Sequence, residues 1–235
     1  MTAPDTADAA AKSGSALRIV IAAERLFARR GIDGVSLRQI SVEAGSSNNS
    51  AVHYYFGSKE GLIGAIFRHR LPQLLSERRL LAARCDPGDL RSRFEAHYLP
   101  VLNLAEASDN HYISFVEQLQ RRAIESGTHA PGLPELPEEG RRSHEEFRRD
   151  LDALLGHLDV PLREMRIAEV ELLCLHAAAD RERAIFSGAE VPPFELFVTS
   201  WLDGNTGFLN APASDATHRW LGRTGGFADP GLRLL

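Results

Sequence analysis

Small polar and aromatic side chains gather over residues 46–56, where the sequence reads SSNNSAVHYYF. An Asn amide can pair with an adenine edge, and Ser and His side chains can bond either base edges or phosphate oxygens. A Tyr hydroxyl or a Lys ammonium can likewise hold a phosphate, a contact that sets position rather than sequence. The residues suited to such contacts are Ser36, Ser47, Asn48, Asn49, Ser50, His53, Tyr54 and Lys59.

Two short helices are predicted to position these side chains. Ser36 to Gln39 has the pattern of a capping box, in which Ser36 accepts from the third helical amide and Gln39 reaches back. That helix ends at Gly45, where a tight bend needs a positive φ. A second helix then runs through residues 51–56 until Gly57. The pattern therefore predicts a helix-turn-helix, a motif whose second helix enters the major groove of DNA.

The spacing within the second helix predicts which side chains face outward. Val52 and Phe56 are four residues apart and are expected to bury toward the core, which leaves His53 and Tyr54 outward and Tyr55 partly buried. The alternative reading is that residues 46–50 form only a solvated loop with two helix caps, because helix-turn-helix spacing alone is a weak signal.

The net charge of −5 conceals two opposed parts of the chain. Residues 11–70 hold nine basic and four acidic residues, a net charge of +5, whereas residues 71–235 have a net charge of −8. Such asymmetry hints at contact between the basic part and a nucleic acid or membrane. Chance unevenness remains an alternative.

The remaining pattern predicts an all-α chain. Residues 1–13 lack periodic apolar positions and are expected to be a disordered arm, and residues 211–235, rich in Gly and Pro, an irregular tail. Between them, apolar residues recur at helical spacing and no βαβ alternation or internal repeat is visible. Further helices are expected at about 73–84, 88–106, 110–126, 142–157, 162–187 and 193–209. Three prolines in residues 127–140 predict a loop.

Composition argues against several functional classes. Cys85 and Cys174 provide neither a disulfide framework nor a zinc-ligand pair, so a reducing cytoplasm is expected and no metal or cofactor is predicted. The N-terminus lacks a signal-peptide pattern, and no stretch reaches about 18 uncharged apolar residues, so no membrane association is expected. We also predict that the chain is not an enzyme, because it has no phosphate loop, nucleophile elbow or HExxH motif.

The N-terminal segment resembles the DNA-binding domain of the tetracycline-repressor (TetR) family of transcriptional regulators. The resemblance rests on Ile19 to Phe27, Gly31, Gly34 to Ile40, Glu43 to Gly45, and above all the run AVHYYFGSKEGL at 51–62. Three departures affect the individual base contacts. The turn after Gly45 is one residue longer than the common form, His53 stands where Tyr is common, and Tyr55 stands where His is usual.

The resemblance implies a DNA-binding domain at 14–60 and, at 61–210, a helical domain that binds an effector and dimerises. For the effector, polar or aromatic residues within apolar helical periods are candidates, namely Tyr98, His111, Tyr112, Phe115, Gln118, Arg121, Cys174 and His176. For the homodimer, two late helices are apolar around most of their circumference, as a helix must be when it packs on both its own domain and a partner. Their apolar residues are Val170, Leu172, Leu173, Leu175, Ala177, Ala178 and Ala179, with Phe194, Phe197, Val198, Trp201, Leu202 and Phe208.

The expected function is transcriptional regulation. A C2 dimer would place its reading helices about 34–36 Å apart, or a multiple of that, on a palindromic double-stranded operator. A small-molecule effector of unknown identity would release this repressor from DNA by favouring a conformation that no longer fits. The alternative is a ligand-independent activator or repressor that acts through protein partners.

Overall fold

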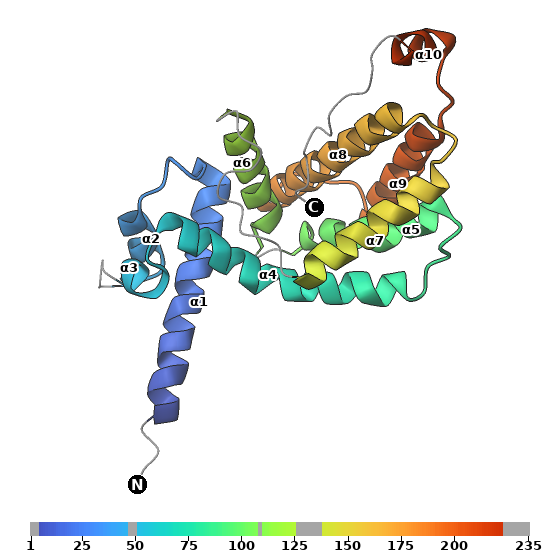
Figure 1. The fold of residues 1–235 in the computed structure, drawn as a ribbon. Coiled ribbons are helices and arrows are strands. Elements are labelled where there is room, and N and C mark those ends of the chain that lie inside the picture. The colour runs from blue at the N-terminus through green and yellow to red at the C-terminus, as the bar shows by residue number, and fades with distance from the viewer. Residues whose placement is uncertain (1–4, 47–50, 108–109, 126–137, 223–235) are drawn as a thin grey trace. The chain divides into compact units, whose positions relative to one another are not determined.

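The computed structural model describes residues 5–46, 51–107, 110–125 and 138–222 (Figure 1). Within those ranges every regular element is a helix, which confirms the predicted all-α class. In chain order the helices are α1 (Asp5–Arg30), α2 (Leu37–Glu43), α3 (Ala51–Phe56), α4 (Lys59–Ala82), α5 (Leu90–Leu104), α6 (Tyr112–Glu125), α7 (Glu138–Leu154), α8 (Val160–Phe186), α9 (Phe194–Asn210) and α10 (Asp215–Leu221).

The chain divides into two compact units, residues 1–72 with 109–135 and residues 73–108 with 136–235. The predicted DNA-binding domain spans residues 14–60, and the first compact unit also contains α6, which packs closely against α1. Contacts between helices more than 80 residues apart leave no trace in a local hydrophobic pattern. The helix-turn-helix therefore shares its core with a helix from the middle of the sequence.

Aromatic packing holds the first unit together. Phe115 of α6 stacks on Phe27 of α1, with ring centroids 6.1 Å apart, and also contacts Phe67 of α4 at 5.7 Å. Ile40 of α2 and Val52 of α3 are fully buried, and α1 packs against both of these short helices. Burial of one such side chain contributes about 1.5–3 kcal/mol.

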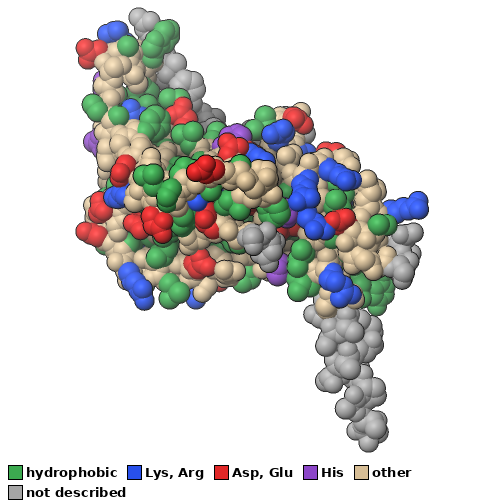
Figure 2. All heavy atoms as spheres, turned by 180° about the vertical axis from the view of Figure 1, so that it is seen from behind, with side chains coloured by type: hydrophobic (Ala, Val, Ile, Leu, Met, Phe, Trp, Pro, Cys, Tyr) green, Lys and Arg blue, Asp and Glu red, His purple; other side chains and the backbone are tan. Residues whose placement is uncertain are grey.

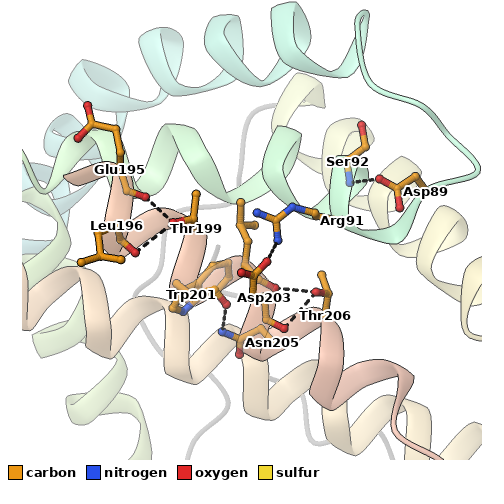
Figure 3. A network of polar contacts seen from close by, with 11 residues as sticks. Asp89, Arg91, Ser92, Glu195, Leu196, Thr199, Trp201, Asp203, Asn205 and Thr206 are labelled. Atoms are coloured by element: carbon orange, nitrogen blue, oxygen red, sulfur yellow. Dashed lines mark hydrogen bonds and ion pairs between the residues drawn. The ribbon is translucent and has the colours of Figure 1, made fainter. Parts of the chain in front are cut away.

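The second unit is built around α5, which packs against α7, α8 and α9. Polar contacts accompany this packing along α9 (Figure 3). Asn205 donates to the Trp201 carbonyl at 2.7 Å, and Arg91 of α5 forms an ion pair with Asp203. These contacts satisfy polar groups at the edge of an apolar interface.

Both predicted irregular ends contain helix. We expected a disordered arm over residues 1–13, but α1 begins at Asp5. Four alanines between residues 7 and 11 favour helix by propensity, even where no apolar stripe exists for packing. Likewise, α10 forms within the predicted tail, where Ser214 accepts from the Thr217 amide at 3.2 Å and caps the helix.

Acidic and basic side chains are interspersed on the face shown in Figure 2, with hydrophobic side chains between them. No helix in the described ranges has both the length and the apolar character needed to cross a bilayer.

Several large apolar side chains are exposed on the surface of the chain. They include Leu80, Ile124, Val160, Met165 and Leu196.

Candidate nucleic-acid interface

The predicted capping box at the start of α2 is present. The Gln39 amide donates to Ser36 Oγ at 3.3 Å, and the Ser36 amide donates to Gln39 Oε1 at 2.8 Å. The extended backbone of Ser36, with φ −92° and ψ 153°, is the usual conformation of such a cap. Ser36 thus fixes the direction in which α2 begins.

The bend after α2 is a Schellman motif centred on Gly45. The Gly45 amide donates to the Val42 carbonyl at 3.0 Å, and the Ser46 amide donates to the Ser41 carbonyl at 2.9 Å. Gly45 has φ +67°, a conformation that an L side chain adopts only with strain. The structure confirms the predicted need for glycine here. Residues 47–50, which include Ser47, Asn48, Asn49 and Ser50, lie outside the described residues.

Helix α3 presents an outward face formed by His53 and Tyr54. Both side chains are exposed, and Tyr54 is 76% accessible. The Tyr54 ring packs edge-on against Tyr55, with centroids 5.1 Å apart, and Tyr55 is half-buried as expected. Phe56 is only half-buried, so Val52 is the main residue that anchors the inward face of this short helix in the core.

Lys59 is positioned by the protein itself. Its Nζ donates to the Ile32 carbonyl at 2.9 Å, which ties the start of α4 to the loop between α1 and α2. An ammonium has three donors, so this bond leaves capacity for a phosphate oxygen. Arg38, which is not among the predicted DNA-contacting residues, has an exposed side chain on α2 two residues after the Ser36 cap. The sequence signal that points to Arg38 is its position in the first turn of α2, next to the Ser36 cap.

Two of the basic residues in the positive segment serve internal ion pairs. Arg25 pairs with Glu43, a contact in which both side chains are more than a third exposed. Arg70 of α4 binds Glu24 of α1 in a bidentate manner, with both N–O distances 2.8 Å. Glu24 and Glu43 are already subtracted in the net charge of +5, so these pairs leave that charge unchanged. They do remove two of the nine basic residues from those that could neutralise phosphates.

Glu24 is the most buried of these charged groups, with 1% of its surface accessible. Besides the two Arg70 donors, its Oε1 accepts from the His111 backbone amide just before α6, at 3.0 Å. One carboxylate thereby joins α1, α4 and the start of α6. At the other end of α6, Arg122 forms an ion pair with Asp33 at 3.2 Å.

The predicted effector residues divide between the two units. His111, Tyr112, Phe115, Gln118 and Arg121 belong to the first unit, and Tyr98, Cys174 and His176 to the second.

In the first unit, Tyr112 and Phe115 pack on Phe67, while Arg121 is exposed. Gln118 Oε1 would lie 3.6 Å from a Cβ atom placed on Gly31, so the Gln118 side chain lies next to the C-terminal end of α1. In the second unit, Tyr98 and Cys174 are fully buried, whereas His176 is exposed on another side of α8.

Many predicted dimer residues lie inside the core of the second unit. Those that are buried are Val170, Leu175, Ala178, Ala179, Val198, Trp201 and Leu202. A helix that is apolar on most sides can pack either of its faces against its own domain. The sequence does not indicate which face is buried there. Leu173 and Phe208 remain exposed, and Phe194 and Phe197 lie beneath the Arg181 guanidinium.

Acid is expected to destabilise the protein through His111. Burial is the main cause that lowers the pKa of His111 from 6.5 to about 4, with Arg29 nearby adding to it. The unfolded chain takes up this proton near pH 6.5, so the stability from neutral His111 is present above that pH and lost as the pH falls toward 4.

Urea denaturation at pH 7 and pH 5 tests this expectation. His111→Gln should lose less stability between the two pH values than the unaltered chain, because the Glu24 contact uses the backbone and is kept. The exposed His157 provides the matched control, His157→Gln. Equal losses in the two variants would contradict the assignment.

A capped α2, a glycine bend and an exposed α3 define a helix-turn-helix domain of the DNA-binding class. Residues 19–66 match the family described as "Bacterial regulatory proteins, tetR family". It is 35% identical over 83 residues to the HTH-type transcriptional repressor KstR2 of Rhodococcus jostii (strain RHA1). That alignment covers 35% of this chain and only 40% of the repressor.

The fold also resembles that of a transcriptional regulator from Rhodococcus sp. Rha1. The TM-score is 0.52 at 22% identity, over 83% of this chain and 95% of the other. This likeness concerns the fold alone.

Proposed function

We propose that the chain is a DNA-binding transcriptional regulator, a repressor whose first unit reads a palindromic operator as a homodimer. The observation that carries this proposal is α3, held by the Gly45 bend and the buried Val52, with His53 and Tyr54 exposed on one helix. Similarity to a relative named as a transcriptional repressor supports repression rather than activation.

In this proposal the side chains of the first unit have separate roles. His53, with Asn48, Asn49 and Ser47, would contact base edges, because these lie in or just before the reading helix. Tyr54, Ser50, Lys59 and Ser36 would contact phosphates and set the register of α3 on the duplex. A small-molecule effector and the dimer contact would belong to later helices, with Leu173 and Phe208 as exposed apolar contributors to the dimer.

Gel shift with DNA from upstream of the protein's own coding sequence tests the function. At about 150 mM salt, we expect a retarded band that persists in excess unrelated DNA, because specific binding exceeds non-specific binding by about a thousandfold or more. Competition of the band by unrelated DNA at equal concentration would refute a sequence-reading role.

Two neighbouring variants distinguish base contact from phosphate contact. His53→Ala should reduce the preference for operator over a mutated operator by about tenfold, the worth of one base contact. Tyr54→Phe should weaken binding to both DNAs by the same factor, because the ring and its contact with Tyr55 remain and only a phosphate donor is lost. Titration with both DNAs measures each effect, and an equal loss of preference in both variants would contradict the division of roles.

A further inference from the structure

An aromatic cluster lies inside the second unit, formed by Phe94 and Tyr98 of α5, Phe147 of α7 and Trp201 of α9. Tyr98 lies 4.8 Å from Phe94, 5.6 Å from Phe147 and 5.2 Å from Trp201, measured between ring centroids. Tyr98 is fully buried and Trp201 is 8% accessible. The cluster therefore brings three helices together around one tyrosine.

Two hydrogen-bond donors in this cluster have no partner among the described residues. They are the Tyr98 hydroxyl and the Trp201 indole Nε1, both fully enclosed by protein atoms. The Trp201 backbone carbonyl is bonded to Asn205, so only the indole end of this residue is unsatisfied (Figure 3). Buried polar groups without partners are rare, and two on adjacent rings point to an acceptor that arrives from outside the chain.

The surrounding charges favour a neutral acceptor. Burial raises the pKa of Tyr98 well above 10.0, with the Glu171 carboxylate adding to this effect, so the hydroxyl remains a donor. Arg78 and Arg148 oppose that effect, but Arg78 donates to the His97 carbonyl at 2.9 Å and Arg148 forms an ion pair with Glu164. The two cations near Tyr98 are balanced by the carboxylates of Glu171 and Glu164, which leaves no excess cation to compensate a ligand carboxylate.

We propose that the Tyr98 hydroxyl and the Trp201 indole bind the carbonyl oxygen of a neutral, ring-containing apolar molecule, whose body replaces ring contacts within the aromatic cluster. The proposal deepens the effector role under the proposed function and rests on it. It keeps Tyr98, one of the predicted effector residues, and adds Trp201, one of the apolar residues predicted for the dimer interface. Admission of the ligand separates the rings, so binding changes the packing of α5 against α7 and α9.

Fluorescence of Trp201 provides the test. The chain has two tryptophans, and Trp220→Phe removes the other one, which is 63% exposed on α10. In this background and without DNA, the probes are 1-decalone and decalin, which share a two-ring skeleton and differ by the carbonyl. We expect saturable quenching by 1-decalone and weaker binding of decalin.

Tyr98→Phe should weaken 1-decalone binding by about tenfold, the worth of one hydrogen bond, and leave decalin binding unchanged. The variant should fold, because it removes an unsatisfied hydroxyl, and its thermal midpoint should be equal to or higher than that of the parent. Tyr55→Phe, at a half-buried tyrosine of the first unit with no assigned binding role, is the matched control and should bind 1-decalone as the parent does.

No saturable binding of 1-decalone, or equal binding by the Tyr98→Phe variant, would overturn the proposal. Because the titration contains no DNA, that result would leave an operator gel shift standing. Conversely, binding of 1-decalone by a chain that shows no sequence preference on DNA would refute the regulatory function and not the ligand site.

Discussion

Glu24→Gln is expected to lower the free energy of unfolding by about 3 kcal/mol, at the low end of the cost of breaking a buried ion pair. The amide oxygen can still accept one hydrogen bond, but the Arg70 guanidinium, only 16% exposed, loses its counter-charge. The His111 amide competes with Arg70 for the remaining acceptor. Urea denaturation followed by circular dichroism measures the change.

Glu43→Gln is the matched control for this prediction. Glu43 also pairs with an arginine, Arg25, but both side chains are more than a third exposed. Water compensates most of the loss in that setting, so we expect a change of less than about 1 kcal/mol. Similar losses from the two substitutions would show that burial does not decide the strength of the Glu24 pair.

Gly61→Ala is expected to destabilise the first unit by about 3 kcal/mol, at the upper end of the cost of overpacking. A Cβ at residue 61 would lie 2.1 Å from the Phe56 carbonyl oxygen, which is backbone at the end of α3. Because that atom cannot turn away, α3 or the start of α4 must shift. Thermal unfolding measures the loss, and operator binding should fall with it because α3 carries His53 and Tyr54.

Gly14→Ala is the matched control in the same unit. Gly14 lies within α1, and a Cβ there would meet no atom within 4 Å. The substitution should therefore stabilise the helix by about 0.5–1 kcal/mol, since alanine loses less backbone entropy. If Gly61→Ala were as harmless as Gly14→Ala, the close approach of α3 to α4 would have no role in the fold.

The local features of the helix-turn-helix were predictable because they depend on residues that are close together in the sequence. The Ser36 capping box joins residues three apart, and the Gly45 bend needs one backbone conformation that glycine supplies without strain. The outward placement of His53 and Tyr54 follows from the four-residue spacing of Val52 and Phe56. Family motifs between residues 19 and 66 placed these features on a known fold.

The late helices show what a local pattern leaves open. Helix α8 is apolar on most sides, as expected for a helix that packs on both its own domain and a partner, and only the structure shows which of its residues are buried in their own unit. The N-terminal segment, predicted as a disordered arm, contains the start of α1 from Asp5 onward. It lacks an apolar stripe, yet its alanines favour helix by propensity.

The sequence by itself determined the helical class, the capped and glycine-bent helix-turn-helix and the family resemblance of residues 19–66, because each depends on motifs of residues a few positions apart. Only the tertiary structure decided that α6 belongs to the first unit and that Glu24 joins Arg70 and the start of α6. It also decided that the rings of Tyr98 and Trp201 are in contact and that each carries an unsatisfied donor. These are contacts between residues about 46 to 103 positions apart. They depend on how helix faces pack, and local periodicity carries no information about which faces meet.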